Sequence, residues 1–137
     1  MIIADTSAIV ALIDADDRHH AALRAAFEAD PGSWVLPWAV LAEIDYLLLH
    51  HVSADIELAF VQDLAEARWQ VEWGGEEDMV RAAELCERYG TLGLGLVDGV
   101  VMSVAERLRA NAIATLDERH FGAVKLVRSF RILPRDL

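Results

Sequence analysis

Short apolar runs alternate with helix-like stretches along most of the chain, and this alternation is the feature that most limits how it can fold. Each run is too short for a stable helix, and the segment after it carries apolar residues at helical spacing. Strands separated by helices in this way are typical of a parallel sheet with helices on both faces. We therefore expect an α/β fold, with a doubly wound parallel sheet of about four to five strands flanked by helices.

Turn-forming and helix-capping residues set the limits of the predicted elements. Asp30-Pro31-Gly32-Ser33 is a strong helix breaker, and Gly90 suits the C-terminal cap of a helix. No repeat, low-complexity tract or linker interrupts the series, so residues 1–137 are expected to form one domain. Strands are predicted at 1–4, 34–36, 70–73, 112–115 and 131–133, and helices at about 8–13, 18–29, 38–51, 55–68, 76–89 and 97–110.

The composition predicts a soluble, cytoplasmic protein that shares part of its surface with a partner. Cys86 is the only cysteine, so one chain can form neither a disulfide framework nor a thiolate zinc site. The first residues lack the pattern of a signal peptide, and no apolar run approaches the roughly 20 residues of a membrane span. The 55% share of hydrophobic residues is high for a small domain, which favours a homodimer, a bound second protein, or both.

The net charge of −11 argues by itself against a nucleic-acid ligand, because phosphate binding needs basic side chains. The distribution of the charges weakens that objection. Residues 1–106 contain 20 acidic and 5 basic residues, whereas residues 107–137 contain 3 acidic and 7 basic residues. An acidic body can hold cations while a basic C-terminal segment steers a polyanion toward them.

Four acidic residues lie in settings that are unusual for ordinary surface charge. Two directly follow predicted strands, one lies within an apolar helical stretch, and one opens a helix: they are Asp5, Asp117, Glu43 and Asp98. The carboxyl ends of parallel strands are where ligands of such sheets collect. Mg²⁺ and Mn²⁺ prefer carboxylate oxygens, and converging carboxylates repel one another unless a cation neutralises them. If the four meet, they predict a divalent metal site.

Taken one at a time, each of these acids also has an ordinary structural interpretation. Asp5 and Asp98 are good helix N-caps, since aspartate is preferred there. Asp117 suits an Asx turn, and Glu43 can simply be exposed. Asp45 competes with Glu43, because residues two apart on a helix project about 200° apart and only one can face a site. We favour Glu43 for its apolar neighbours, although the pattern alone leaves these alternatives open.

Read together, four short motifs resemble those of the PIN-domain family in order, spacing and context across essentially the whole chain. They are Asp5-Thr6-Ser7, Leu41-Ala42-Glu43-Ile44, Leu96-Val97-Asp98-Gly99 and Thr115-Leu116-Asp117. Any one of them occurs by chance, but four in order with the right elements between them are specific. More narrowly, the chain is similar to the VapC-type toxins of bacterial toxin–antitoxin pairs, which are single PIN domains of about this length. The family often has serine where this chain has Gly95, a departure that affects a local hydrogen bond and not the metal ligands.

The resemblance implies both a chemistry and partners. It implies a PIN-like sheet and hydrolysis of single-stranded or looped RNA by an endoribonuclease. It also implies homodimers and inhibition by a cognate antitoxin protein. The implied ligands of Mg²⁺ or Mn²⁺ are Asp5, Glu43, Asp98 and Asp117.

Further residues can support such a site. A bound divalent cation lowers the pKa of a coordinated water, which then attacks the phosphodiester without a 2′-hydroxyl nucleophile. Candidates to orient the carboxylates from behind are Thr6, Ser7 and Thr115. Candidates to hold the RNA backbone, with solvated surface charge as the alternative, are Arg119, His120, Arg128 and Arg131.

Two other functions compete with this prediction. A phosphoacceptor signalling domain is also small, acidic, α/β and Mg²⁺-binding, but it needs paired acids beside the first strand and a lysine after the last. Here Thr6 and Ser7 follow Asp5, and the only lysine, Lys125, lacks the expected surroundings. The second alternative is a non-catalytic PIN scaffold that only binds RNA or protein, which the intact set of four acids disfavours.

Overall fold

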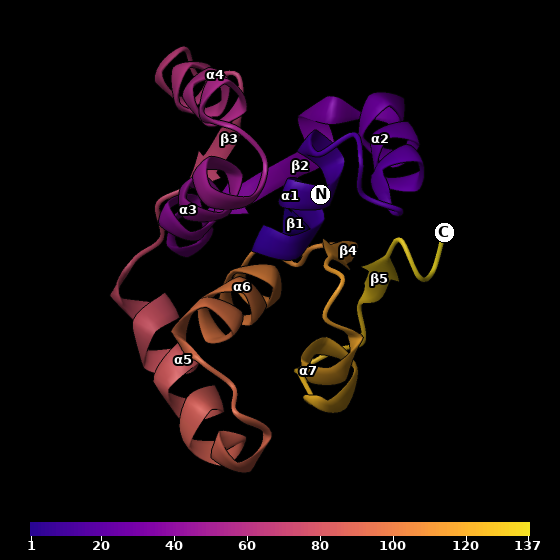
Figure 1. The fold of residues 1–137 in the computed structure, drawn as a ribbon. Helices are drawn as coiled ribbons and strands as arrows, with labels where there is room; N and C mark the ends of the chain where they lie inside the picture. The colour runs from indigo at the N-terminus through magenta and orange to yellow at the C-terminus, as the bar shows by residue number, and fades with distance from the viewer.

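The computed structural model describes residues 1–137 and has one five-stranded parallel sheet at its centre (Figure 1). The strands are β1 (Ile2–Ala4), β2 (Trp34–Pro37), β3 (Gln70–Glu72), β4 (Ala112–Ala114) and β5 (Arg131–Leu133). Their order is β3-β2-β1-β4-β5, so β1 is central and the chain crosses to the other half of the sheet beside it. Such a reversal leaves a crevice at the carboxyl ends of the central strands.

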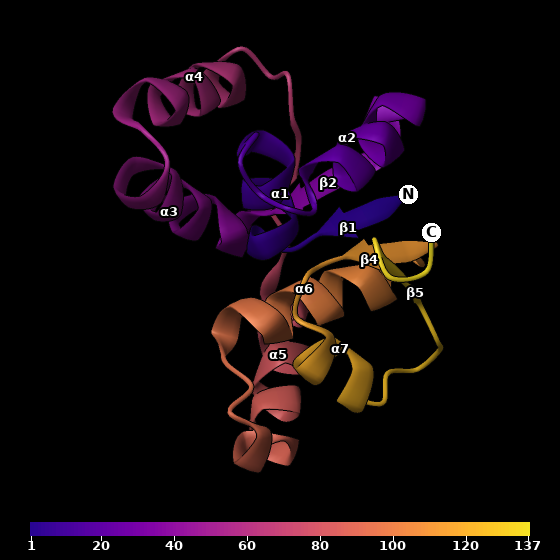
Figure 2. The ribbon, with the colours of Figure 1, turned by 45° about the vertical axis from the view of Figure 1, so that its right-hand side comes forward.

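Helices cover both faces of the sheet (Figure 2). In chain order they are α1 (Thr6–Ile13), α2 (His20–Ala29), α3 (Leu41–His51), α4 (Ala54–Ala65), α5 (Glu76–Arg88), α6 (Leu96–Arg107) and α7 (Glu118–Ala123), with short 3₁₀ turns η1 (Pro31–Ser33), η2 (Trp38–Val40) and η3 (Gly90–Leu92). In both views β1 lies between α1 and α6, with α1 to α4 on one side and α5 and α6 on the other. Every helix falls short of the length and apolar content that a bilayer crossing requires.

Helix α6 runs through the middle of the molecule and is the most buried of the helices. All seven residues from Gly99 to Ala105 are buried, among them Met102, whose side chain belongs to the main core. A Cβ atom on Gly99 would lie 3.1 Å from the Cβ of Ala82 and 3.2 Å from its backbone. Glycine at this position therefore lets α5 and α6 approach closely, just one residue after Asp98.

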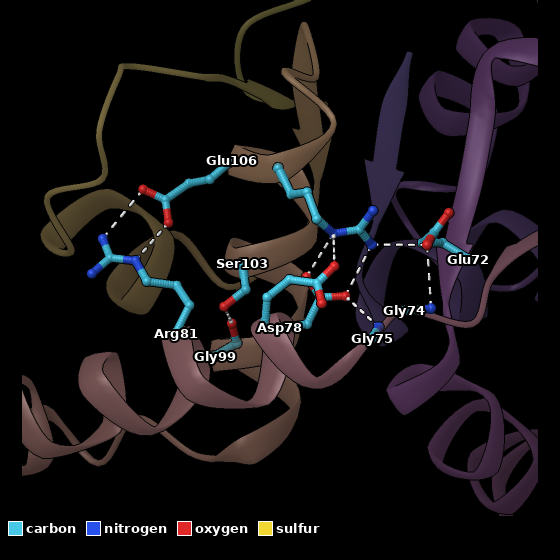
Figure 3. Close-up of polar contacts among 10 residues, drawn as sticks. Glu72, Gly74, Gly75, Asp78, Arg81, Gly99, Ser103 and Glu106 are labelled. Carbon is cyan, nitrogen blue, oxygen red and sulfur yellow. Dashed lines mark hydrogen bonds and ion pairs between the residues drawn. The ribbon is translucent and has the colours of Figure 1, made fainter.

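Partly buried ion pairs hold the C-terminal end of α6 in place. Arg107 donates to both carboxylate oxygens of Asp78 at 2.8 and 2.9 Å and to Glu72 at 2.8 Å, which joins α6 to the start of α5 and the end of β3 (Figure 3). Arg81 makes a bidentate pair with Glu106 in the same view. Asp78 is 1% exposed, so its charge depends on Arg107 for compensation.

The predicted parallel sheet and its five strands are confirmed, and the ends of the predicted helices differ from the observed ends by three residues or fewer. Helix α7 is the exception, because the sequence predicts no element between the fourth and fifth strands. It has only six residues, most of them polar at its start, so it carries no helical period that a pattern can reveal. This helix proves to carry part of the candidate site.

Candidate metal centre

Asp5 ends β1 and is the most deeply buried of the four candidate carboxylates, at 5% exposure. It occupies the N-cap position of α1, but its side chain makes no capping hydrogen bond. Its Oδ2 atom instead accepts from the Thr115 hydroxyl at 2.8 Å and from the Ser7 hydroxyl at 3.2 Å. Burial raises the pKa of Asp5 to about 6, against the lowering effect of the Thr115 hydrogen bond. The Asp5 carboxylate is therefore fixed by the Ser7 and Thr115 hydroxyls and does not cap α1.

The hydroxyls of Ser7 and Thr115 join the ends of β1 and β4 into one polar network. The two oxygens lie 3.3 Å apart, Ser7 accepts from the Leu116 N–H at 2.9 Å, and Thr115 accepts from the Asp117 N–H at 3.0 Å. Each hydroxyl thus supports one carboxylate and one backbone turn. Thr6 differs, because its buried Oγ1 atom has no hydrogen-bond partner in the protein.

Asp98 lies in the first turn of α6, where Gly95 and not Asp98 is the N-cap residue. Its side chain is 21% exposed, and burial raises its pKa. A hydrogen bond from the Gly95 backbone and the charge of His120 act in the opposite direction, while the charges of Asp117 and Glu43 raise the pKa further. The charge of Asp98 also raises the pKa of Asp5. All three other candidate carboxylates therefore lie within reach of the charge on Asp98.

Asp117 caps α7 and faces Asp98 at the same time. Its Oδ1 accepts from the His120 N–H at 3.0 Å, and its Oδ2 lies 2.6 Å from Nδ1 of the His120 ring. The other ring nitrogen, Nε2, lies 2.8 Å from the Leu92 carbonyl oxygen. The pKa of His120 is raised mainly by its hydrogen bond to that carbonyl and, next in size, by its hydrogen bond to Asp117. Ligand atoms of Asp98, Asp117 and His120 all lie within 4.8 Å of one another.

Glu43 approaches the cluster from the first turn of α3. The sequence places it among apolar neighbours, but the structure leaves it exposed, because α3 buries the stripe of Ile44 and Leu48 beside it. Asp45 is less exposed than Glu43 and lies beside Glu57 of α4, whose pKa it raises chiefly through a shared hydrogen bond. Between Glu43 and Asp45, it is the charge of Glu43 that raises the pKa of Asp98. Asp5 and Glu43 both lie outside the 4.8 Å group.

The donor atoms of this site fit a hard divalent cation. The Nε2 of His120 is engaged by a backbone carbonyl and its Nδ1 by Asp117, so its ring holds a ligand in place and offers no free nitrogen. The remaining donors are carboxylate oxygens, which suit Mg²⁺ or Mn²⁺ better than zinc. Carboxylates that raise one another's pKa values are stabilised when a cation comes between them.

The basic residues predicted to hold RNA have varied surroundings. Arg119 is exposed on α7, and Arg131 donates to the Asp136 carbonyl at 3.0 Å. Arg128 donates to the Ala110 carbonyl at 2.6 Å. Both ring nitrogens of His120 are engaged, one by Asp117 and the other by the Leu92 carbonyl, so the ring has no nitrogen free for RNA. The link from His120 to Asp117 is the feature of the site that the sequence analysis missed, and its three-residue spacing at a helix start is the available signal.

Comparisons with known proteins agree with this architecture. Residues 2–126 match the model of the PIN domain. Ribonuclease VapC26 of Mycobacterium tuberculosis is 33% identical over 135 residues, which cover 97% of this chain and 100% of that relative. The chain belongs to the PIN-domain family.

Solved structures show the same fold at lower sequence identity. The VapC20 structure of Mycobacterium tuberculosis, described as a sarcin–ricin-loop-cleaving toxin, has a TM-score of 0.77 at 21% identity and covers 94% of this chain and 100% of its own. DNA-bound VapBC from Salmonella typhimurium has a TM-score of 0.68 at 18% identity, with 96% and 95% covered. FitAcB from Neisseria gonorrhoeae has a TM-score of 0.66 at 16% identity, with 96% of each chain covered.

Proposed function

We propose that this chain is a metal-dependent endoribonuclease and the toxin of a type II toxin–antitoxin pair. The observation that carries the proposal is that ligand atoms of Asp98 and Asp117 lie within 4.8 Å of one another at the carboxyl end of the sheet, where the Thr115 hydroxyl joins the Asp117 backbone to the Asp5 carboxylate. Two relatives support the choice of substrate, because one is named a ribonuclease and the other a toxin that cleaves the sarcin–ricin loop.

The chemistry we assign to the residues follows from their positions. A divalent cation bound here supplies charge neutralisation at a phosphate oxygen and an acidified water. Asp98 and Asp117 lie closest together and would provide the main ligand oxygens for Mg²⁺ or Mn²⁺. Asp5 would complete the ligand set from the buried side and Glu43 from the exposed side, where RNA must enter.

The residues around the ligands would hold those oxygens in place. Ser7 and Thr115 fix one oxygen of Asp5. The His120 ring bridges Asp117 and the Leu92 carbonyl and so fixes the Asp117 carboxylate. Hydrogen-bonded supports of this kind set the orientation and basicity of metal ligands.

We also propose that the chain acts in the cytoplasm, as one domain over residues 1–137, bound to an antitoxin and paired as a homodimer. Large apolar side chains remain exposed on two faces. On α3 and α4, Tyr46 is 58% exposed and Leu58 is 52% exposed. Near the start of α5, Trp73 is 72% exposed and Val80 is 61% exposed. Exposed apolar clusters of this kind favour coverage by other protein chains.

The decisive experiment is cleavage of labelled RNA by the wild type and by Asp98→Asn, each with Mg²⁺ and with a chelator. Cleavage is expected only for the wild type with metal, while circular dichroism shows both proteins folded. If partner-free wild type cuts no RNA with either Mg²⁺ or Mn²⁺, the proposal is wrong and the non-catalytic scaffold takes its place.

A phosphoacceptor function receives no support from the site. The side chain of Lys125 lines a groove beside α7, and its backbone N–H binds the Tyr89 hydroxyl at 3.1 Å. Labelling with a phosphodonor is expected to leave Asp5 unmodified, because its buried oxygen is already held by two hydroxyls.

A further inference from the structure

A groove of about 640 Å³ lies between α7, β5 and the segment 124–130 that connects them. Its floor is apolar and comes from Ile113 of β4, Ile132 of β5 and Phe121 of α7. Its rim carries basic side chains from the connecting segment and from the C-terminal end of the chain. Figure 2 shows this connection bowing outward between α7 and β5, on the side of the sheet that holds α6.

The charge of the groove is opposite to that of the rest of the protein. Lys125, Arg128 and Arg135 line it, and no acidic residue does. Arg135 is paired with Asp136 at 2.8 Å, so its charge is largely compensated. Arg128 donates to the Ala110 carbonyl, and neither Arg128 nor Lys125 forms an ion pair. Two cations are therefore available to an anionic ligand on a protein of net charge −11.

An aromatic ring accompanies these cations. The Arg128 guanidinium lies 5.4 Å from the centre of the Phe130 ring, and both side chains line the groove. Basic side chains beside aromatic rings are the combination that binds unpaired nucleic-acid strands, because phosphates meet the cations and bases stack on the ring faces.

The connecting segment is held in position before any ligand arrives. The Val127 N–H donates to a carboxylate oxygen of Glu106 at 2.8 Å, and the Lys125 N–H donates to the Tyr89 hydroxyl at 3.1 Å. Glu106 is itself fixed by Arg81 of α5. A preformed groove loses little conformational entropy on binding.

Helix α7 joins the groove to the candidate metal centre. Its N-cap residue Asp117 and its His120 belong to the acidic cluster, whereas Phe121 and Gly122 line the groove. The helix has six residues and is roughly 9 Å long, so an RNA strand cut at the cluster needs only a few further nucleotides to pass α7.

We propose that this groove binds an unpaired stretch of the substrate RNA beside the cleaved bond, with its phosphates on Lys125 and Arg128 and a base against Phe130. The proposal rests on the ribonuclease function proposed above. It accounts for the positive charge of Lys125 and Arg128, which no acidic side chain pairs. An acidic protein segment is the competing occupant, and the test separates the two.

The test measures binding of a labelled single-stranded RNA by fluorescence anisotropy in the Asp98→Asn background, where the RNA stays intact. The Lys125→Gln/Arg128→Gln pair is compared with Arg18→Gln/Arg24→Gln, which removes the same charge from exposed positions near α2. We expect the groove pair to weaken RNA binding about tenfold and to reduce the salt slope by about 1.4, two single-strand phosphate contacts at about 0.7 each. Phe130→Leu, which keeps an apolar side chain, is expected to weaken binding about fivefold.

The same pairs are then placed in the active protein, where the groove pair is expected to raise KM for a long RNA about tenfold and the control pair to leave it unchanged. RNA binding and KM equal to those of the control pair would overturn the groove proposal and leave the nuclease intact. Binding of labelled polyglutamate as tightly as RNA would also overturn it, in favour of an acidic protein segment. Groove-dependent RNA binding without any metal-dependent cleavage would instead support the groove and overturn the proposed function.

Discussion

The Thr115 hydroxyl donates a 2.8 Å hydrogen bond to Asp5, although the two residues are 110 positions apart in the chain. This bond crosses from the end of β4 to the end of β1 and opposes the rise in the pKa of Asp5 that burial causes. Thr115→Val should therefore weaken Mg²⁺ binding about tenfold, as loss of a ligand's hydrogen-bonded support usually does. The check is the Mg²⁺ concentration for half-maximal RNA cleavage, with Thr115→Ser as the control that keeps the hydroxyl. Equal requirements in the valine and serine variants would contradict this role.

The buried charge of Asp5 is expected to lower the free energy of unfolding while serving the metal site. A rise in its pKa from the ordinary 3.8 to about 6 means that the folded protein binds the proton more tightly than the unfolded chain. The buried charge then costs up to about 3 kcal/mol at neutral pH, and the cost disappears as the pH falls through 6 toward 4. In the presence of chelator, Asp5→Asn should raise the melting temperature by about 5 °C at pH 7 and abolish cleavage.

The pH dependence provides the control for Asp5. The difference in melting temperature between Asp5→Asn and the wild type should shrink between pH 7 and pH 5, because the wild-type carboxyl group becomes protonated. Differential scanning fluorimetry of both proteins across this range measures it. A difference that stays constant with pH would show that the buried charge is not the source of the cost.

Sequence patterns locate much of this site and single out Ser7 and Thr115 as supports of its carboxylates, but they do not give the contacts that these hydroxyls make. Asp5 and Asp117 follow strand-like runs, and that position alone predicts that both lie at the carboxyl edge of the sheet. The hydrogen bond of Thr115 to Asp5 joins the two ends of the chain, so no local pattern contains it. His120 lies on a six-residue helix without a detectable period. The exposure of Glu43 depends on how α3 rests on the core, which apolar neighbours in sequence do not decide.

Arg107 should be far more important for stability than an arginine of an exposed ion pair. Its removal leaves Asp78, at 1% exposure, as a buried charge with no cationic partner. Breaking such a pair commonly costs about 3–5 kcal/mol, whereas an exposed pair contributes less than about 1 kcal/mol. Urea unfolding should therefore show a loss of about 3 kcal/mol for Arg107→Ala and little change for Arg24→Ala, whose partner Glu28 is exposed. Similar losses in the two variants would contradict the assignment.

The nucleophile is expected to be water, because a divalent cation bound by these acids would supply an acidified water and would need nothing from the sugar. An RNA with a single 2′-deoxy sugar on the 5′ side of the cut bond should then be cleaved at a rate within a few-fold of the all-RNA substrate. Mass spectrometry of the products should show a 5′-phosphate and a 3′-hydroxyl. A 2′,3′-cyclic phosphate, or complete resistance of the deoxy substrate, would identify the 2′-hydroxyl as the nucleophile instead.

Direct measurement of Mn²⁺ binding tests, without reference to RNA, whether the four acids form one site for a divalent cation. Electron paramagnetic resonance titration of the free protein should show saturable Mn²⁺ binding, weakened at least about tenfold in Asp98→Asn. Asp16→Asn, which removes an exposed acid beyond the opposite end of α1, should bind Mn²⁺ like the wild type. Equal Mn²⁺ binding by Asp98→Asn and Asp16→Asn, or no saturable binding by the wild type, would contradict the account.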